Sequence, residues 1–400
     1  MLKLYNSLTR EKEVFKPLKK NNVSIYVCGI TPYDTTHIGH AFTYVFFDVL
    51  IRYLALKGYK VKYTQNVTDI DDDILKKAKE EGKNWKILGD YWTDRYIQDM
   101  KSLNVLLPTN FVKATDSINK MIQIIISLLK KGLAYKRDGN IYFDVGKFKK
   151  YGRLSKFNRK QMILISKERG ADPSDPFKKD PLDFVLWQKT KAGEPFWPFD
   201  SAQGKEKGRP GWHIECSAMA DRFLGQRIDI HGGGKDLIFP HHESEIAESE
   251  SYTGKAPFVR YWMHTGMVFC NGEKMSKSLG NLIMIKDLLK KYTPNAVRWT
   301  LLSHHYKQPW EYEEKELEYA RNCINIVKKA VKQKNSSSKK IIGASYFNKF
   351  IKIMDDDVNT PRSLELVLKV AKRILKKNKK DEGTLILFLE SITKTLGFKL

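Results

Sequence analysis

Two histidines near the beginning of the chain are spaced so that they could bind phosphate. His37-Ile-Gly-His40 ends a stretch typical of a strand and opens one typical of a helix. At positions i and i+3 the imidazoles share one face of the first helical turn, where free N–H groups and the helix dipole attract anions. Gly39 would let a ligand approach the backbone closely. The same spacing also occurs by coincidence on protein surfaces, or as a pair of hydrogen-bonded histidines in a core. The segment alone therefore does not establish a phosphate site.

A second candidate segment lies much later in the chain. Lys274-Met-Ser-Lys-Ser278 follows Asn271-Gly272, a dipeptide typical of a two-residue hairpin turn. A loop with two ammonium groups and two hydroxyls could close over a triphosphate and stabilise the charge that develops on leaving pyrophosphate. The competing interpretation is a solvated polar turn, because lysine-rich stretches are normally exposed.

Four further side chains, those of Cys28, Cys216, His241 and Glu245, could form a zinc site. We expect Cys28 at the end of a strand beside the histidine turn, Cys216 in the first turns of a helix, and His241 one helical turn before Glu245. Their wide separation gives no characteristic metal-binding spacing, and buried cysteines are often small apolar residues. His242 would serve almost as well as His241. The residues alone therefore leave the zinc site open.

Together, in this order, the first two segments resemble the HIGH and KMSKS signatures of class I aminoacyl-tRNA synthetases, without a substitution. Other segments are similar to the cysteinyl-tRNA synthetase pattern in particular. These are Val27-Cys-Gly-Ile-Thr-Pro-Tyr-Asp34, Asn66-Val-Thr-Asp-Ile-Asp-Asp72, Asp183-Phe-Val-Leu-Trp187, Gly208-Arg-Pro-Gly-Trp-His-Ile-Glu-Cys-Ser-Ala218, His231-Gly-Gly-Gly234 and Phe239-Pro-His-His-Glu-Ser-Glu-Ile-Ala247. The resemblance extends from about residue 20 to 320, and Met354-Asp-Asp-Asp-Val-Asn-Thr-Pro361 resembles a further family signature. The chain departs from the pattern at Phe42, where relatives often have a basic residue, and at Asp73, where they often have lysine.

This resemblance implies an enzyme that joins L-cysteine to the 3′-terminal adenosine of cysteine tRNA. ATP and cysteine would form cysteinyl-adenylate and pyrophosphate first. His37 and His40, with Gly39 between them, would hold the phosphates of ATP. Lys277, together with Lys274 and Mg²⁺, would stabilise the departing pyrophosphate. No protein nucleophile is needed.

The resemblance also implies one zinc ion per chain and selects its ligands: Cys28, Cys216, His241 and Glu245. Zinc binds a thiolate well, whereas the hydroxyl of serine competes poorly with water. The metal would thus provide a discrimination that pocket size cannot, and no editing domain is expected.

Three more residues are implied to contact or orient the substrate beside Cys28. Thr68 and Trp212 match positions that line the amino-acid pocket, and Asp236 could orient the substrate or neighbouring groups. Each also has an ordinary interpretation: a hydroxyl at a strand end, a core residue and a helix cap. Two other functions stay open as well. One is a ligase that joins activated cysteine to a small amine, as in the mycothiol pathway; the other is a catalytically silent RNA- or zinc-binding relative.

The composition excludes several classes of protein. The 400 residues are 42% hydrophobic and include 71 Lys and Arg against 46 Asp and Glu, a net charge of +25. This excess indicates a polyanionic partner such as tRNA and argues against a small amine as acceptor. Four scattered cysteines form no disulfide framework, so we expect a cytoplasmic protein, with Cys270 and Cys323 in the core. The first fifteen residues contain no apolar stretch, so we expect no leader, and Met121–Leu129 is too short to span a membrane, so we expect no membrane contact. We also expect a monomer.

The elements that must position these residues begin as an α/β unit. Strands predicted at Val23–Gly29 and Tyr59–Val67 flank an apolar helix over Ile38–Leu56, which makes a parallel β-α-β unit. Further predicted elements are helices over 71–81, 84–103 and 117–131, a hairpin over 135–145, a long exposed loop over 189–210, a helix from about His213, a strand at Ile228–Ile230, a glycine turn at His231–Gly234, a helix from Pro240 and helices from about Glu313 onward, broken at 335–338 and 359–361.

We therefore expect an α/β protein: a class I Rossmann-type catalytic domain with an inserted connective domain, followed by an all-α bundle. The expected boundaries are 1–105 for the first catalytic half, 106–185 for the insertion, 186–255 for the second half, 256–310 for the KMSKS segment and linking fold, and 311–400 for a tRNA-binding bundle. Relatives usually carry an anticodon-reading domain after the bundle, and this sequence resembles a short form without it. Phosphate contacts, which position tRNA but carry little sequence information, are expected from Lys328, Lys329, Lys372, Arg373, Lys376, Lys377, Lys379 and Lys380.

Overall fold

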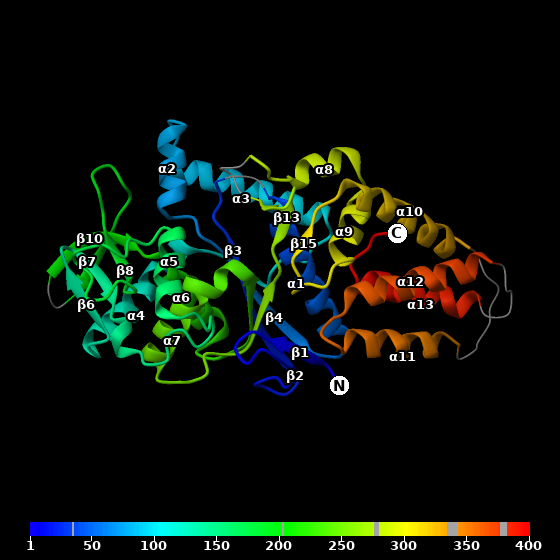
Figure 1. The fold of residues 1–400 in the computed structure, drawn as a ribbon, viewed down its shortest axis with the longest axis horizontal. Coiled ribbons are helices and arrows are strands. Elements are labelled where there is room, and N and C mark those ends of the chain that lie inside the picture. The colour runs from blue at the N-terminus through cyan, green and yellow to red at the C-terminus, as the bar shows by residue number, and fades with distance from the viewer. Residues whose placement is uncertain (34–35, 202–203, 276–279, 334–341, 377–381) are drawn as a thin grey trace.

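The structure of this chain is a computed structural model that describes residues 1–33, 36–201, 204–275, 280–333, 342–376 and 382–400 (Figure 1). Within these residues, a five-stranded parallel sheet in the order β12-β11-β3-β4-β5 forms the centre of the molecule. Its strands are β3 (Asn22–Ile30), β4 (Lys60–Val67), β5 (Asn110–Lys113), β11 (Ile228–Gly234) and β12 (Val259–Thr265). Helix α1 (Ile38–Leu56) connects β3 to β4, which confirms the predicted β-α-β unit.

Alternate residues of β3 face two different cores. Ile25 and Val27 pack in the core that contains α1, whereas Tyr26 and Cys28 pack in the core that contains α6 (Trp212–Leu224) and α7 (Glu243–Thr253). This follows from the two-residue period of a strand, and helices cover both faces because a parallel sheet is buried on both sides. The alternation places Cys28 on the same face of the sheet as α6, the helix that carries Cys216.

Helix α1 is the central helix of the core. By length and composition alone it could cross a membrane, but 78% of that stretch is buried inside the fold. Its inner position therefore accounts for its apolar composition without a membrane.

Between β5 and α6 the chain forms an insertion around an antiparallel sheet in the order β6-β7-β8-β10-β9. Its strands are β6 (Ala134–Arg137), β7 (Asn140–Phe143), β8 (Phe184–Lys189), β9 (Trp197–Ser201) and β10 (Gly204–Pro210). The predicted hairpin at Asp138-Gly139 is confirmed, but the predicted loop over 189–210 is wrong, since it contains β9 and β10. The sequence shows no period here. The two segments are strands because β10 pairs with both β8 and β9.

Helices accompany both sheets. They are α2 (Asp72–Glu80), α3 (Trp85–Ser102), α4 (Ile118–Lys130) and α5 (Arg159–Glu168), the first three close to their predicted bounds. The sheets do not divide at residues 105 and 185, because β5 pairs with β4 in the parallel sheet and β10 pairs with β8 in the insertion. A strand of four residues, such as β5, is too short to be recognised from the period of its sequence.

The segment from His231 to Gly234 is the end of β11, so the predicted glycine turn is wrong. A Cβ atom at Gly232 would lie 2.0 Å from the ring of Phe47, so this glycine allows α1 to approach the strand closely. The helix predicted from Pro240 is present: Phe239 is extended (φ −142°, ψ 135°), as residues before proline tend to be, and helical backbone follows it, as a π-type turn through His242 and as α7 from Glu243.

The remaining chain forms a small sheet and a helical bundle. The sheet contains β13 (Val268–Cys270), β14 (Glu273–Lys274) and β15 (Trp310–Glu311), and the predicted hairpin at Asn271-Gly272 is confirmed, with both residues at positive φ. The helices are α8 (Ile285–Lys291), α9 (Pro294–Leu302), α10 (Glu314–Val331), α11 (Ile342–Met354), α12 (Thr360–Leu375) and α13 (Glu382–Thr395); a short hairpin, β1 (Lys3–Asn6) and β2 (Glu11–Val14), opens the chain.

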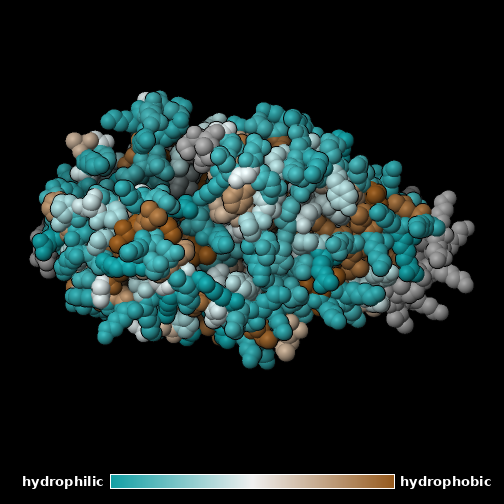
Figure 2. Space-filling model, in the orientation of Figure 1, coloured by the Kyte–Doolittle hydropathy of each residue, from teal (hydrophilic) through white to brown (hydrophobic). Residues whose placement is uncertain are grey.

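Helices α10 to α13 lie on the opposite side of the central sheet from the insertion (Figure 1). The face drawn in Figure 2 is mainly hydrophilic, as expected for a chain with this charge. Some predicted features lie outside the described residues: Ser276–Ser278 with Lys277, the break at 335–338, Lys377, Lys379 and Lys380. Cys270 and Cys323 are buried, as predicted.

Candidate functional site

A cavity of about 520 Å³ opens at the carboxyl ends of β3, β4 and β11. This edge of a parallel sheet is where ligands usually bind. The predicted site residues that line it are Cys28, His37, Gly39, His40, Thr68, Trp212, Cys216, Asp236, His241 and Lys274. Glu245 is fully buried and contacts two of these residues, whereas Lys277 lies outside the described part of the chain. The fold thus brings residues from distant segments to one place.

The two histidines of the first motif lie at the beginning of α1. His37 is the N-cap of the helix, and its Nδ1 accepts a hydrogen bond of 3.1 Å from the backbone N–H of Gly39. A ring nitrogen that accepts cannot carry a proton, so the proton of the neutral ring is on Nε2. The rings of His37 and His40 lie 3.8 Å apart, and a Cβ atom at Gly39 would lie 2.9 Å from the His37 ring. Glycine is therefore the residue that fits between them.

The four predicted zinc ligands lie close together. The distances are 3.7 Å between the Sγ atoms of Cys28 and Cys216, 3.8 Å between Cys28 Sγ and Glu245 Oε1, and 3.2 Å between His241 Nε2 and Glu245 Oε1. Ligands of a tetrahedral zinc ion are about 3.3–3.8 Å apart, given bonds of about 2.0–2.3 Å. All four donor atoms are buried and lie within 4.8 Å of one another. The donor set of two thiols, an imidazole and a carboxyl therefore fits zinc in both chemistry and size.

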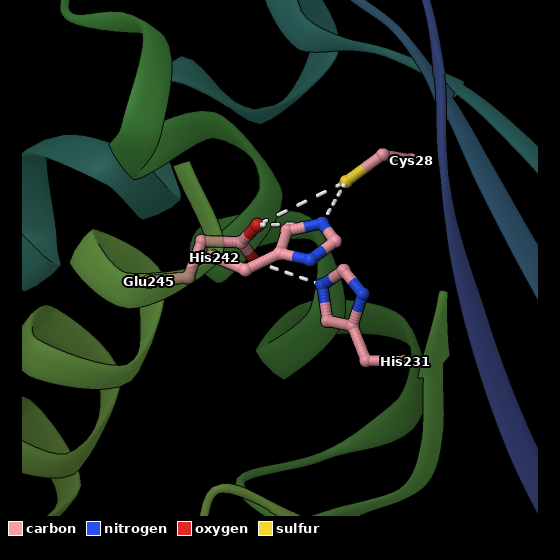
Figure 3. Close-up of side chains that lie close together, drawn as sticks. All are labelled: Cys28, His231, His242 and Glu245. Atoms are coloured by element: carbon pink, nitrogen blue, oxygen red, sulfur yellow. Dashed lines mark hydrogen bonds and ion pairs between the residues drawn. The ribbon is translucent and has the colours of Figure 1, made fainter. Parts of the chain in front are cut away.

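A second set of four residues in the described structure meets the same criterion: Cys28, His231, His242 and Glu245 (Figure 3). Here Cys28 Sγ lies 3.2 Å from His242 Nε2, and His231 Nε2 lies 2.9 Å from Glu245 Oε2. Neither His231 nor His242 lines the cavity, whereas Cys216 and His241 do. A metal that must contact a ligand in the cavity is thus better placed on Cys216 and His241, and His231 can orient Glu245 by a hydrogen bond.

Burial determines the charge of these groups. It raises the pKa of the Cys28 and Cys216 thiols and of the Glu245 carboxyl, and it lowers the pKa of His241. The protein without a metal therefore holds these groups in their neutral forms. Metal binding would release protons from the thiols and the carboxyl, so its affinity should depend on pH.

The other cavity residues have defined partners. The Trp212 ring stacks on His241, with centroids 4.4 Å apart. Thr68 Oγ1 accepts a hydrogen bond of 3.2 Å from the amide of Asn66, which itself accepts one from the Gly29 backbone. Trp212 therefore shapes the cavity wall beside His241, and Thr68 is held by a network that runs from β4 to β3.

Asp236 lies between two cations from different parts of the chain. Its Oδ2 is 3.5 Å from Arg169 of the insertion and 3.8 Å from Lys274 of the β13–β14 hairpin. Its carboxylate therefore links three segments at the mouth of the cavity, rather than only capping a helix.

Two further histidines of the site, His231 and His213, are not among the residues predicted from the sequence. His231 was assigned to a glycine turn, and His213 Nδ1 lies 3.1 Å from His241 Nδ1. Their only signal was the presence of histidine near other predicted ligands. The two departures from the family pattern have local partners: Phe42 packs on Trp310, and Asp73 accepts a hydrogen bond of 3.0 Å from Tyr33, which lines the cavity.

Comparison with known proteins agrees with this geometry. Residues 14–322 match the family described as tRNA synthetases class I (C) catalytic domain. A cysteine–tRNA ligase of Trichodesmium erythraeum is 46% identical over 388 residues, which are 93% of this chain and 78% of that protein. This chain belongs to the cysteinyl-tRNA synthetase family. A cysteine–tRNA ligase of Methanococcus maripaludis is 44% identical over 94% of this chain and 80% of its own length.

Solved structures of class I synthetases share the fold of this cysteinyl-tRNA synthetase family member. Methionyl-tRNA synthetase of Mycobacterium tuberculosis in complex with methionyl-adenylate has a TM-score of 0.65 at 14% identity, covering 94% of this chain and 89% of that one. The leucyl enzyme of Agrobacterium radiobacter K84, in a ternary complex with tRNA, has a TM-score of 0.67 at 11% identity, covering 96% and 84%. The predicted fold class, a class I α/β catalytic domain with a helical C-terminal part, is confirmed.

Proposed function

We propose that this chain activates L-cysteine with ATP and transfers the cysteinyl group to the 3′ end of cysteine tRNA. The observation that carries the proposal is that one cavity contains both the thiol-rich set of Cys28, Cys216 and His241 and the histidines of the α1 N-terminus. An amino acid held at the first set would have its carboxylate directed along the same cavity as the phosphates of ATP. All four cysteines are free thiols, which supports a reducing, cytoplasmic setting.

At the amino-acid end, the protein residues select and orient cysteine. Zinc bound by Cys28, Cys216, His241 and Glu245 would supply a soft Lewis acid that prefers a thiolate to a hydroxyl. Trp212 forms the wall beside His241, and Asp236 offers a carboxylate to the ammonium group of the substrate. His231 holds the second oxygen of Glu245.

At the phosphate end, the residues stabilise charge. His37 would donate its Nε2–H to a phosphate oxygen, and the first turn of α1 would add backbone N–H groups and the positive end of the helix dipole. Lys274 lines the cavity and could contact the β- and γ-phosphates with Mg²⁺. We assign Lys277 the same role from its place in the sequence.

Cysteine-dependent exchange of pyrophosphate into ATP tests the first step. We expect exchange with cysteine and at least about 1,000-fold less with serine at equal concentration, which is more than the about 10–200-fold that size alone would provide between such substrates. Removing zinc with a chelator should abolish the exchange. Exchange that is equal for the two amino acids, or that survives full removal of the metal, would refute the proposal.

The acceptor distinguishes this function from a ligase that uses a small amine. With the purified chain, cysteine tRNA should accept the cysteinyl group and an amino sugar should not. The charge of +25 supports tRNA as the acceptor, as do the basic side chains of Lys329 on α10, Lys372 and Arg373 on α12, and Lys376 at its C-cap. Transfer to the amino sugar alone would establish the alternative.

Two substitutions at His37 separate its helix-capping role from its role toward phosphate. Asparagine is a good N-cap, so His37→Asn should leave stability within about 0.5 kcal/mol, whereas His37→Ala should lose about 1 kcal/mol. Both remove the imidazole, so both should slow adenylate formation by at least about ten-fold. This is the effect expected from losing one hydrogen bond to a charged group. Urea unfolding and pyrophosphate exchange measure the two effects. If His37→Asn exchanged pyrophosphate at the unaltered rate, the imidazole would have only a capping role.

A further inference from the structure

The loop between α11 and α12 carries a buried carboxylate that no part of the proposed chemistry uses. Asp357 is fully buried, and it and Val358 have positive φ angles of 61° and 52°. Such angles are uncommon outside glycine and are strained for a β-branched residue, so the surrounding contacts must hold this backbone in place. A strained, buried acid between two bundle helices indicates a specific positioning role.

Asp357 connects the bundle to two segments of the catalytic part. Its Oδ1 accepts hydrogen bonds of 2.8 Å from the Tyr306 hydroxyl and 2.8 Å from the backbone N–H of Tyr5 in β1. Its Oδ2 faces Lys307 at 3.7 Å and His305 at 3.9 Å. One carboxylate thus holds the segment from His305 to Lys307 against the bundle.

Tyr306 transmits this constraint toward the cavity. Its backbone carbonyl accepts a hydrogen bond of 2.7 Å from the N–H of Gly266, and its ring stacks on Phe46 of α1 at 4.0 Å. A Cβ atom at Gly266 would lie 2.2 Å from the carbonyl oxygen of Gln308, so the two backbones are in direct contact. Gly266 and Met267 line the cavity.

The same segment continues into the strand that supports the lysine hairpin. β15 pairs with β13 through Val268 and Trp310, and β13 pairs with β14, which ends at Lys274. In Figure 1, β13 and β15 lie between the insertion and the bundle helices. The wall that carries Lys274 into the cavity is therefore supported from behind by residues 306–312, and these are held by Asp357.

We propose that Asp357 is a positioning residue for adenylate formation: by holding Tyr306 it sets the position of the β13–β14 hairpin and of Lys274 relative to the phosphates of ATP. This inference rests on the proposed function. Asp357 would also connect the helical bundle, where tRNA is proposed to bind, to the β13–β14 hairpin. Displacement of a charged group by a fraction of an ångström lowers the rate of the chemical step while ground-state binding of the other substrate is retained.

The test compares Asp357→Asn, Tyr306→Phe and the double variant. Tyr306→Phe removes only the hydroxyl and keeps the ring stack on Phe46, so it should fold even if the Asp357 variant does not. Asp356→Asn is the matched control, because the neighbouring acid is half exposed and pairs with Lys12 instead. Pyrophosphate exchange, zinc content and the hydrogen exchange of the amides in residues 266–275 are measured for each.

We expect the turnover of pyrophosphate exchange to fall about ten-fold in both single variants, with the KM for cysteine within about two-fold and zinc unchanged. The double variant should be no worse than Tyr306→Phe, because Asp357→Asn only removes the charge from the hydrogen bond that Tyr306→Phe removes entirely. Amides of residues 266–275 should exchange faster in these variants and not in Asp356→Asn. A merely structural role would not produce this separation of turnover from KM.

Other outcomes would overturn the inference. Unaltered turnover in Tyr306→Phe, additive losses in the double variant, or an equal loss in Asp356→Asn would each show that Asp357 does not position the hairpin. A wild-type chain with no cysteine-dependent exchange would instead refute the proposed function, and the inference with it.

Discussion

Replacing Cys216 with serine is expected to remove zinc and to lower cysteine activation by at least about 100-fold. Cys216 is 1% exposed, and its sulfur lies 3.7 Å from that of Cys28 at the wall of the cavity. A serine hydroxyl cannot provide the thiolate ligand, and even the outer partners of a metal site contribute about 10–100-fold. ATP binding should largely survive, because the α1 N-terminus and Lys274 do not depend on the metal. Metal analysis, pyrophosphate exchange and ATP titration measure the three properties.

Cys323→Ser is the matched control, since it makes the same change at a buried cysteine of α10 far from the cavity. It should keep one zinc ion per chain and full activation. Undiminished activation by the Cys216 variant with no bound metal would refute the zinc hypothesis. Retention of a full equivalent of zinc would instead place the ion on Cys28, His231, His242 and Glu245, the second set in Figure 3.

Replacing Arg298 with methionine is expected to cost about 3–5 kcal/mol of unfolding free energy. The guanidinium is 1% exposed and forms an ion pair with the fully buried Asp48 of α1. It also donates hydrogen bonds to the carbonyl oxygens of Leu396 at 2.6 Å and Leu103 at 2.9 Å. Methionine fills much of the volume but leaves a buried carboxylate with fewer partners, and Arg52 can compensate only in part. The urea midpoint measures the loss.

Arg321→Met is the appropriate comparison for this change. Arg321 lies on the exposed face of α10 and pairs with Glu318 one turn away. Exposed pairs contribute about 0–1 kcal/mol, so its midpoint should hardly move. If the two variants unfolded at the same urea concentration, the contacts of Arg298 would not hold α1, α9 and the end of the bundle together.

Local patterns in the sequence were sufficient for the elements that carry the motifs. The apolar period predicted α1 over Ile38–Leu56, and Asn271-Gly272 predicted the β13–β14 hairpin. These features depend on interactions between residues a few positions apart, which a sequence displays directly. The HIGH motif could be placed for the same reason, because it lies where a strand ends and a helix begins.

Features that depend on long-range pairing could not be predicted in this way. The segment 189–210 has the composition of a loop. It nevertheless forms β9 and β10, because β10 pairs with β9 on one side and with β8 on the other. The glycines at 232 and 233 signalled a turn, but at position 232 the close approach of the Phe47 ring is what requires glycine.

The sequence by itself determined which chemistry this protein could carry: histidines at a helix start, lysines after a hairpin, and cysteine, histidine and glutamate as soft, borderline and hard metal ligands. Only the tertiary structure decided that these groups meet. Cys28 and Cys216 are 188 positions apart, and it is the two-residue period of β3 together with the packing of α6 on that face that brings their sulfurs to 3.7 Å. The structure likewise placed His231 Nε2 2.9 Å from Glu245 Oε2, and His241, rather than His242, at the cavity wall. The physical reason is that contacts between side chains distant in the sequence depend on how sheets and helices pack, which no local spacing records.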